Sequence, residues 1–507
     1  MTSGLRARGD VRNHWHRQQS TDNYCNGRMS CLFAPVTRAI RPGEQWVTIM
    51  DAVDSALTAA RAQFAITISF HIVLAALTIG LANFLMALEA LWLWRGQKIY
   101  LDLYRYWLKV FALNIAVGTA SGLILEYQFG LNWSRLSIQA GNILGPLMFY
   151  EVLAAFFLEA GFLGIMLFGL KKVGPRLHFF ATCAVATGSL ISAFWILSAN
   201  SWMQTPAGYA IGTDGRFIAQ DWWAIIFNPS FPYRLAHMTL AVFLGTATLL
   251  AGVSAWQLLR ASENPRARLV YSMSLWAIVV LTPEQIVVGD LHGRHSLEVQ
   301  PQKVAAIEGS WTRPAHGAGE PLRLFALPDM VERKNHWEVA VPRIGSLYLR
   351  HDLTGTIAAL DEFPPQDIPP VPAVFFAFRL MVGLGLLMLG QGVVGLVLRW
   401  RKRLHATRWM LRVCAWMTPA GLLAMLSGWV VTEVGRQPFT VYGLLRTADS
   451  LSSVSRQQVV GATWTILAFY LVIFGVGLWV LLRLLREPPH AGEPGPQPTL
   501  ADETGGP

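Results

Sequence analysis

The chain has 507 residues, of which 53% are hydrophobic and only 14% are charged, and its mean hydropathy is +0.38. This composition is typical of a membrane protein and excludes an ordinary soluble enzyme of several domains. The net charge of +10 would suggest nucleic acid in a soluble protein, but the basic residues here fall in short loops between apolar runs, so no nucleic-acid partner is expected.

The two ends of the chain differ from the rest. Residues 1–49 are polar, rich in arginine and without the apolar core of a signal peptide. We expect an N-terminal extension that is disordered or not native, with Met50 as the native start. Residues 487–507 are rich in proline and glycine, which predicts a disordered tail.

Apolar stretches of about 20 residues, each long enough to cross a bilayer, recur along the chain. They predict an all-α integral membrane protein with about nine transmembrane helices, six within residues 50–290 and three within 373–486. The predicted spans are 66–93, 106–128, 145–170, 178–198, 234–259, 268–290, 373–398, 408–431 and 462–484.

Basic residues fill every second connection between these spans, which places those connections in the cytoplasm by the positive-inside rule. The N-terminus is therefore predicted outside and the C-terminus inside. The longest connection, 291–372, is predicted to lie outside. The basic connections contain Arg95, Lys98 and Arg105; Lys171, Lys172 and Arg176; Arg260, Arg266 and Arg268; and Arg399, Arg401, Lys402, Arg403 and Arg408.

Ionisable side chains inside a span cost several kcal/mol unless they are paired, face a cavity or bind a cofactor, so each is a functional candidate. Four ionisable residues and one methionine lie near the predicted outer end of their spans, in one layer beneath the 291–372 loop. Imidazole and thioether groups are suitable axial ligands for haem iron. Singly, each residue is also explained by helix–helix hydrogen bonding or by packing, so the layer leaves both readings open. The five are His71, Glu151, His237, Met381 and Glu433.

Other metal centres lack support. Only His71 and His237 lie well inside a span, too few for the haems and copper of a haem-copper oxidase. The four cysteines form neither a C-x-x-C nor a C-x-x-C-H pattern, so a zinc ribbon and covalently attached haem are not expected either.

Several ordered motifs together resemble subunit I of the cytochrome bd-type quinol oxidases, over about residues 50–485. The short outer loop and the sequence of residues 289–295 resemble the cyanide-insensitive branch of that family. The resemblance implies haem bound within the helix bundle near the outer face. The motifs are 61–64 followed by His71, 130–134, Glu151 with 155–159, 192–197, 199–204, 300–308, 378–382 and 433–438.

The same resemblance implies roles for individual residues. His237 and Met381 would be the axial ligands of a low-spin haem b, and Glu433 would bind a high-spin haem b. His71 would bind the third centre, haem d or a further haem b in its place, although the family leaves open which high-spin haem this histidine ligates. Glu151 would lie close to that site. Arg379 and Arg436, in the motifs of Met381 and Glu433, are expected to bind cofactor.

The resemblance also implies that Lys303 and Glu308 bind quinol, because a carboxylate can accept its proton while an ammonium group favours the quinolate. Without the family, an ordinary exposed pair five residues apart is the simpler reading. Protons for water would come from the cytoplasm through Glu159, Ser192 and Glu151. Glu159 would lie about 12 Å along the helix from Glu151 and about 80° around it.

The expected function is a terminal respiratory quinol oxidase of the bacterial inner membrane, which makes a proton gradient without pumping. Its expected substrates are quinol and dioxygen. Its expected partners are subunit II, a small accessory subunit as a further candidate, and membrane lipid. Two alternatives remain: a polytopic transporter, which would contain no chromophore, and a non-catalytic haem-binding anchor, which would bind haem without consuming oxygen.

Overall fold

The computed structural model describes residues 42–496, except for the side chains of residues 42–54 and Phe156. Nine helical segments within this range are long and apolar enough to cross a membrane, which confirms the predicted number. Of the predicted extension, residues 1–41 lie outside the described residues. The spans are Ser55–Arg95, Lys98–Leu131, Ser134–Phe168, Pro175–Gln204, Trp222–Arg260, Pro265–Val299, Pro365–Trp400, Arg408–Val434 and Arg456–Arg486.

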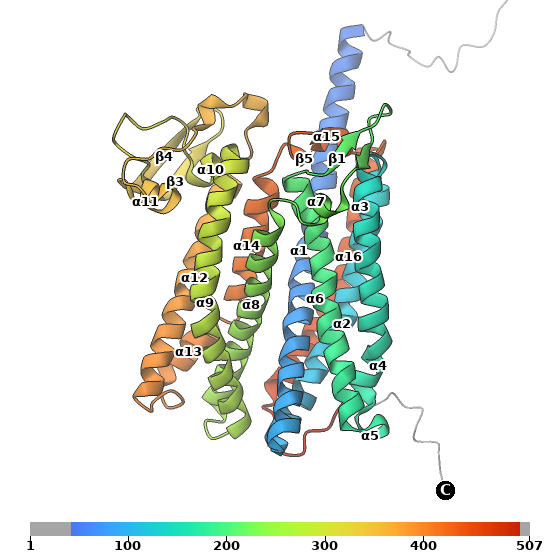
Figure 1. The fold of residues 1–507 in the computed structure, drawn as a ribbon, viewed down its shortest axis with the longest axis vertical. Coiled ribbons are helices and arrows are strands. Elements are labelled where there is room, and N and C mark those ends of the chain that lie inside the picture. The colour runs from blue at the N-terminus through green and yellow to red at the C-terminus, as the bar shows by residue number, and fades with distance from the viewer. Residues whose placement is uncertain (1–41, 497–507) are drawn as a thin grey trace, which may run out of the picture. The chain divides into compact units, whose positions relative to one another are not determined.

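The long helices of the unit that begins at Asp51 form two groups (Figure 1). The first group contains α1 (Pro42–Arg95), α2 (Lys98–Leu131), α3 (Ser134–Ala154), α6 (Pro175–Gln204) and α16 (Arg456–Arg486). The second contains α8 (Phe231–Arg260), α9 (Pro265–Val299), α12 (Val371–Trp400), α13 (Arg408–Trp416) and α14 (Ala420–Val434). Helices α6 and α8 are in contact and join the groups.

Four helices of the second group make a closed ring, because α8 packs on α9, α9 on α12, α12 on α14, and α14 on α8. Helices α8 and α14 approach closely at a pair of glycines. A Cβ atom added at Gly421 would lie only 2.5 Å from the Cα of Gly245. Small residues permit such close crossings between membrane helices.

The third span is not a continuous α-helix. A π-helical turn, Ala155–Ala160, separates α3 from α4 (Gly161–Phe168), and α5 (Leu170–Val173) follows. Because a π-helix has wider turns than an α-helix, the predicted angle between Glu151 and Glu159 does not apply across this segment. Gly174, with φ of +77°, then allows the chain to reverse into α6.

The connection between the sixth and seventh spans begins later than predicted, because α9 continues to Val299. It contains α10 (Pro301–Glu308), the antiparallel hairpin of β3 (Leu322–Asp329) and β4 (Lys334–Val341), and α11 (Ile344–Arg350). We call the end of the bundle that carries this segment the loop end, and the opposite end, with Arg95 and Lys98, the basic end. In Figure 1 the loop end is at the top.

Shorter elements complete the loop end. They are the hairpin of β1 (Tyr209–Ile211) and β2 (Phe217–Ala219), α7 (Trp222–Ile226), the pair β5 (Phe439–Val441) and β6 (Leu445–Arg446), and α15 (Thr447–Ser450).

At the basic end, residues 487–496 of the predicted tail lie against α2. Lys109 forms an ion pair with the buried Glu493, and the backbone N–H of Gly492 donates to Asp102. Asn264 donates to the backbone carbonyl of Pro489. Residues 497–507 lie outside the described residues.

Candidate functional site

His237 and Met381 occupy diagonally opposite helices of the four-helix ring, α8 and α12. A Cβ atom at Gly289 of α9 would lie 3.3 Å from Cε1 of His237, and one at Gly428 of α14 would lie 2.9 Å from Sδ of Met381. Each candidate ligand therefore lies against a glycine. Side chains that project into a helical bundle from facing helices are the usual way to bind a cofactor there.

The Nδ1 atom of His237 is buried and has no hydrogen-bond partner among the residues that the structure describes. An unpaired buried polar atom costs free energy, so it marks a place where a bound group is expected. The ring of His292 on α9 lies 5.5 Å away, measured between ring centroids. His237 therefore fits an axial ligand of iron.

The third candidate ligand, His71 of α1, is oriented by α2. Its Nδ1 lies 3.2 Å from Oγ of Ser121, which itself donates to the carbonyl of Gly118 at 2.7 Å. Because the hydroxyl proton is used there, the Ser121 oxygen accepts from Nδ1–H of His71. The imidazole then has its lone pair on Nε2, which is the form that binds a metal.

Glu433, near the end of α14, is held by α6. Its Oε1 accepts from Nδ2 of Asn200 at 2.9 Å and from Nε2 of Gln204 at 3.1 Å, and its Oε2 lies 2.5 Å from Nη2 of Arg436. The carboxylate is thus fixed in place by three donors. Oε1 already accepts two hydrogen bonds, whereas Oε2 accepts one and keeps a second lone pair, so these contacts leave room for a further ligand bond at Oε2.

Buried cations surround Glu433. Arg234, Lys303 and Arg436 all interact electrostatically with this one carboxylate. Within the described part of the chain, three of their guanidinium nitrogens have no hydrogen-bond partner: Nε of Arg234 and both Nε and Nη1 of Arg436. We call Arg234, Gln204, Lys303, Glu433 and Arg436 the loop-end cluster. Its excess of positive charge and free donors suits the propionate groups of haem.

Lys303 connects the 300–370 segment to this cluster. Its Nζ donates to Oε1 of Gln204 at 2.8 Å, and Nε2 of the same amide donates to Glu433. Burial, with a smaller effect of Arg234, lowers the pKa of Lys303 well below its usual value. Two hydrogen bonds therefore join a predicted quinol-binding residue to a predicted haem ligand.

Glu308 is buried on another side of α10, because residues five apart differ by about 140° around a helix. It accepts a hydrogen bond from the hydroxyl of Tyr348, and Nη2 of Arg379 lies 3.9 Å from its Oε2, for which residues 42–496 supply no hydrogen-bond partner. Burial raises the pKa of Glu308, and Arg379 opposes that effect. Lys303 and Glu308 are both buried, which excludes the reading as an exposed pair, but they do not face each other.

The guanidinium of Arg379 donates to the backbone carbonyls of Arg323, Ile307 and Phe375 at 2.7, 2.8 and 3.0 Å. These bonds attach α10 and β3 to α12. A role of Arg379 in cofactor binding stays a prediction.

The predicted proton path is partly assembled on α6. Oγ of Ser192 donates to Oε1 of Glu151 at 2.7 Å. Glu159 lies one helical turn further along α6, since a Cβ atom at Gly188 would be 3.3 Å from its Cγ. Glu151 is therefore hydrogen-bonded to α6, and Glu159 packs against the same helix one turn away.

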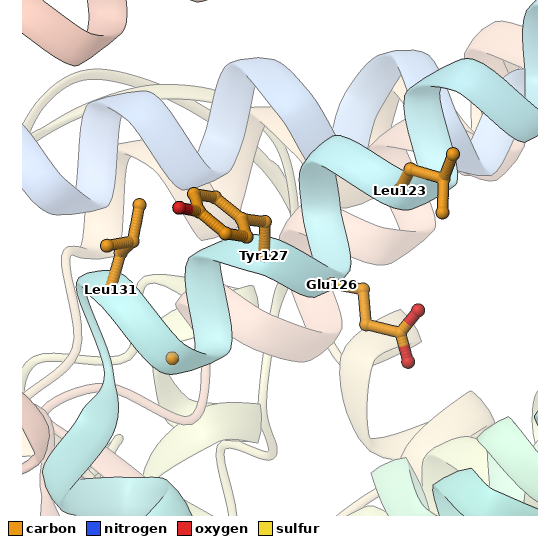
Figure 2. Close-up of a pocket in the computed structure, with 5 residues that line it drawn as sticks. Leu123, Glu126, Tyr127 and Leu131 are labelled. Atoms are coloured by element: carbon orange, nitrogen blue, oxygen red, sulfur yellow. The ribbon is translucent and has the colours of Figure 1, made fainter.

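Sequence reasoning missed several polar residues of these sites. Arg234, Glu89 and Glu126 are ionisable residues of spans, and the rule that found Glu151 could have found them. Glu126 belongs to an open groove on α2, lined also by Leu123, Tyr127, Gly130 and Leu131, and its carboxylate points away from the helix (Figure 2). No sequence signal distinguishes Tyr348.

Three comparisons with known proteins identify the family of the chain. Residues 59–489 match the family model described as cytochrome bd terminal oxidase subunit I. The chain is 34% identical to cytochrome bd ubiquinol oxidase subunit 1 of Bacillus subtilis (strain 168), over 85% of this chain and 92% of that protein. It is 29% identical to cytochrome bd-II ubiquinol oxidase subunit 1 of Escherichia coli (strain K12), over 85% and 96%. The solved bd oxidase from Geobacillus thermodenitrificans matches with a TM-score of 0.77 and 26% identity, over 85% of this chain and 98% of that one.

Proposed function

Because the chain belongs to the cytochrome bd terminal oxidase subunit I family, it is a multi-pass membrane subunit of a terminal respiratory quinol oxidase, and we propose how its residues divide that work. The observation that carries the proposal is the series of hydrogen bonds from Lys303 through Gln204 to Glu433. It connects the segment expected to bind quinol with the layer expected to bind haem.

The residues of the loop end divide into ligands and propionate partners. His237 and Met381 hold a low-spin haem b, Glu433 holds a high-spin haem b, and His71 holds a third haem, of type d or b. Arg436 binds propionate through nitrogens that have no partner within the described chain. Bound haem supplies the one-electron transfers and the reduction of dioxygen.

Quinol binds at α10. Glu308 accepts a hydroxyl proton, which its raised pKa favours, and Lys303 stabilises the quinolate. Two quinols give up four electrons and four protons, and one dioxygen takes up four electrons and four protons to give two water molecules.

We assign the loop end to the outer face of the bacterial inner membrane and the basic end to the cytoplasm, following the positive-inside rule. Quinol protons then leave on the outer side, and the protons for water come from the cytoplasm through Glu159, Ser192 and Glu151. Release and uptake on opposite sides produce a proton gradient without pumping.

Subunit II is the proposed partner, with a small accessory subunit as a second one. Exposed apolar side chains on several spans, among them Leu123, Tyr127 and Leu471, support an environment of lipid or partner helices.

A reduced-minus-oxidised spectrum with haem extraction, combined with quinol-dependent oxygen uptake by the purified complex, tests the proposal. We expect b-type bands, a third haem whose type the extraction identifies, and oxygen uptake. A preparation without chromophore would indicate the transporter, and haem without oxygen uptake would indicate the anchor. Either result overturns the proposal.

A further inference from the structure

A second buried polar cluster lies at the basic end, away from all the residues assigned above. It consists of Glu89 on α1, Tyr104 on α2, and His178 and Thr182 on α6. Each of these residues is almost fully buried. Nδ1 of His178 lies 2.6 Å from Oε1 of Glu89, and both side chains are only 1% exposed. We call these four residues the basic-end cluster.

The hydrogen bonds of His178 fix how many protons the pair holds. Its Nε2 lies 3.0 Å from the backbone carbonyl of Met166, which can only accept, so Nε2 carries a proton. Nδ1 and Oε1 must then share one further proton, as imidazolium with carboxylate or as imidazole with carboxylic acid. In either form the Glu89–His178 pair is neutral and holds one proton that can be transferred.

The remaining hydrogen bonds lead away from this pair. Oγ1 of Thr182 donates to Oε2 of Glu89 at 2.6 Å, in preference to the carbonyl of His178 at 3.4 Å. Since the threonine proton is used there, the Tyr104 hydroxyl at 3.1 Å donates to Oγ1. Two other titratable groups, Tyr104 and Cys183, interact electrostatically with Glu89.

The cluster is in line with the proposed proton path. His178, Thr182, Ser189 and Ser192 are spaced by four, seven and three residues, which places them on one face of α6. Glu159 lies against Gly188 of the same helix. Gly188 is six residues from Thr182, about 9 Å along α6 and about 120° around it, so a proton transfer between Thr182 and Glu159 requires intervening water.

The cluster is also close to the end of the bundle. His178 follows Pro175, the first residue of α6, by three residues, or about 4.5 Å. Glu89 precedes Arg95, the last residue of α1, by about 9 Å. A small opening at the basic end would therefore connect the pair with water.

We propose that the Glu89–His178 pair is the proton-uptake group of this subunit. The pair passes its shared proton through water to the carboxylate of Glu159 and takes a replacement from water at the basic end. This inference rests on the proposed function, which supplies the electrons and the dioxygen that consume the proton. A pair that only joins α1 to α6 is the structural alternative.

Glu89→Gln tests the inference, because it keeps the shape and hydrogen bonding of the side chain and removes the titratable carboxyl. In the purified complex we expect unchanged haem spectra and quinol-dependent oxygen uptake slower by about 10²-fold or more, in line with the range of about 10²–10⁴ for a lost proton-transfer group. When the reduced complex is mixed with oxygen, the phases that take up protons should slow and show a larger solvent deuterium isotope effect.

Asp102→Asn is the matched control. Asp102 is a buried carboxylate of the same end, paired with Arg266 at 2.5 Å. It lies two residues before Tyr104 on α2, about 160° around the helix, and is outside the basic-end cluster. We expect wild-type turnover and an unchanged isotope effect in this variant.

Wild-type turnover and proton uptake in Glu89→Gln would overturn the inference, as would slow turnover with an unchanged isotope effect. If Glu89→Gln does not assemble with its haems, Glu89→Asp replaces it, because the shorter carboxyl still titrates but loses its contact with His178. A displaced pH–rate profile is then expected, and a wild-type profile would contradict the inference. A wild-type complex that lacks haem or oxygen uptake would instead refute the proposed function.

Discussion

The two buried polar clusters lie at opposite ends of the helix bundle and differ in how far their hydrogen bonds are satisfied. In the basic-end cluster the Glu89–His178 contact, the Met166 carbonyl and the two hydroxyls account for every polar side-chain atom. In the loop-end cluster three guanidinium nitrogens of Arg234 and Arg436 have no partner within the described chain. A closed cluster can hold a proton by itself, whereas an open one is completed by a group from outside the chain.

The energetic cost supports this distinction. A buried donor without a partner costs about 1–3 kcal/mol, and more when it is charged. The loop-end cluster also contains three cations for one carboxylate, Glu433. Bound carboxylate groups would remove both costs.

The largest effect is expected when the proposed haem ligands next to the loop-end cluster are removed. We expect His237→Ala and Met381→Leu to abolish the low-spin haem signal, because each removes a residue that would hold this haem in the proposed assignment. Reduced-minus-oxidised spectra of the purified complex provide the measurement. Glu89→Gln is the natural control, since it is expected to keep all haem bands, and an intact low-spin signal in both ligand variants would refute their assignment.

The next largest effect concerns the link between α10 and the cluster. Lys303→Ala and Glu308→Ala should keep the haem spectra and lower quinol-dependent oxygen uptake by about 10²-fold or more, because each removes a group that handles the quinol proton. Oxygen uptake driven by an artificial electron donor that bypasses quinol should be preserved. Normal quinol turnover in both variants would contradict the proposed quinol site.

Substitution of Arg436, the ion-pair partner of Glu433, tests how the charges of the loop-end cluster contribute to stability. Arg436→Gln should destabilise the subunit by about 3–5 kcal/mol, because the substitution breaks a buried ion pair. The free energy of unfolding can be compared by denaturant titration, and the high-spin bands should shift in the same variant. Arg313→Gln, which breaks the exposed pair with Glu362, should leave both measurements unchanged.

The smallest effect is a displaced pH profile. The Tyr348 hydroxyl lowers the pKa of Glu308, although burial raises it overall. In Tyr348→Phe the pKa of Glu308 should therefore rise further, so the carboxylate is protonated up to a higher pH. The acidic limb of the quinol-dependent kcat/KM profile should move to higher pH, with little change on the alkaline side. An unmoved acidic limb would argue against Glu308 as the base.

The fold was largely predictable from the sequence because a span needs only enough apolar residues, and nine such stretches stand out. His71, His237 and Glu433 could be singled out from the sequence because ionisable groups are rare in spans, while their role as haem ligands stays a prediction. The π-helical turn at Glu159 and the continuation of α9 to Val299 were not, because local composition does not distinguish them from neighbouring helix.

The hydrogen-bond partners of the predicted site residues could be predicted from the sequence only in part. Gln204, Tyr348 and Thr182 are ordinary residues in isolation, and their importance comes from partners far away in the chain. Thr182 contacts Glu89 across 93 positions, and Gln204 contacts Glu433 across 229. Apolar periodicity carries no information about such pairings.

The contact between Gly245 and Gly421 has a consequence for electron flow. These glycines belong to α8 and α14, the helices that carry His237 and Glu433. With no side chain on either helix at the crossing, no rotamer change can adjust their separation. The crossing therefore fixes the distance between the backbones of α8 and α14 at this point. Under the proposed assignments these two helices carry haem ligands, and the rate of electron tunnelling between redox centres falls steeply with distance. A methyl group in Gly421→Ala would lie 2.5 Å from the Cα of Gly245 and is therefore expected to push the helices apart and slow electron transfer, although residue 421 is not among the proposed ligands.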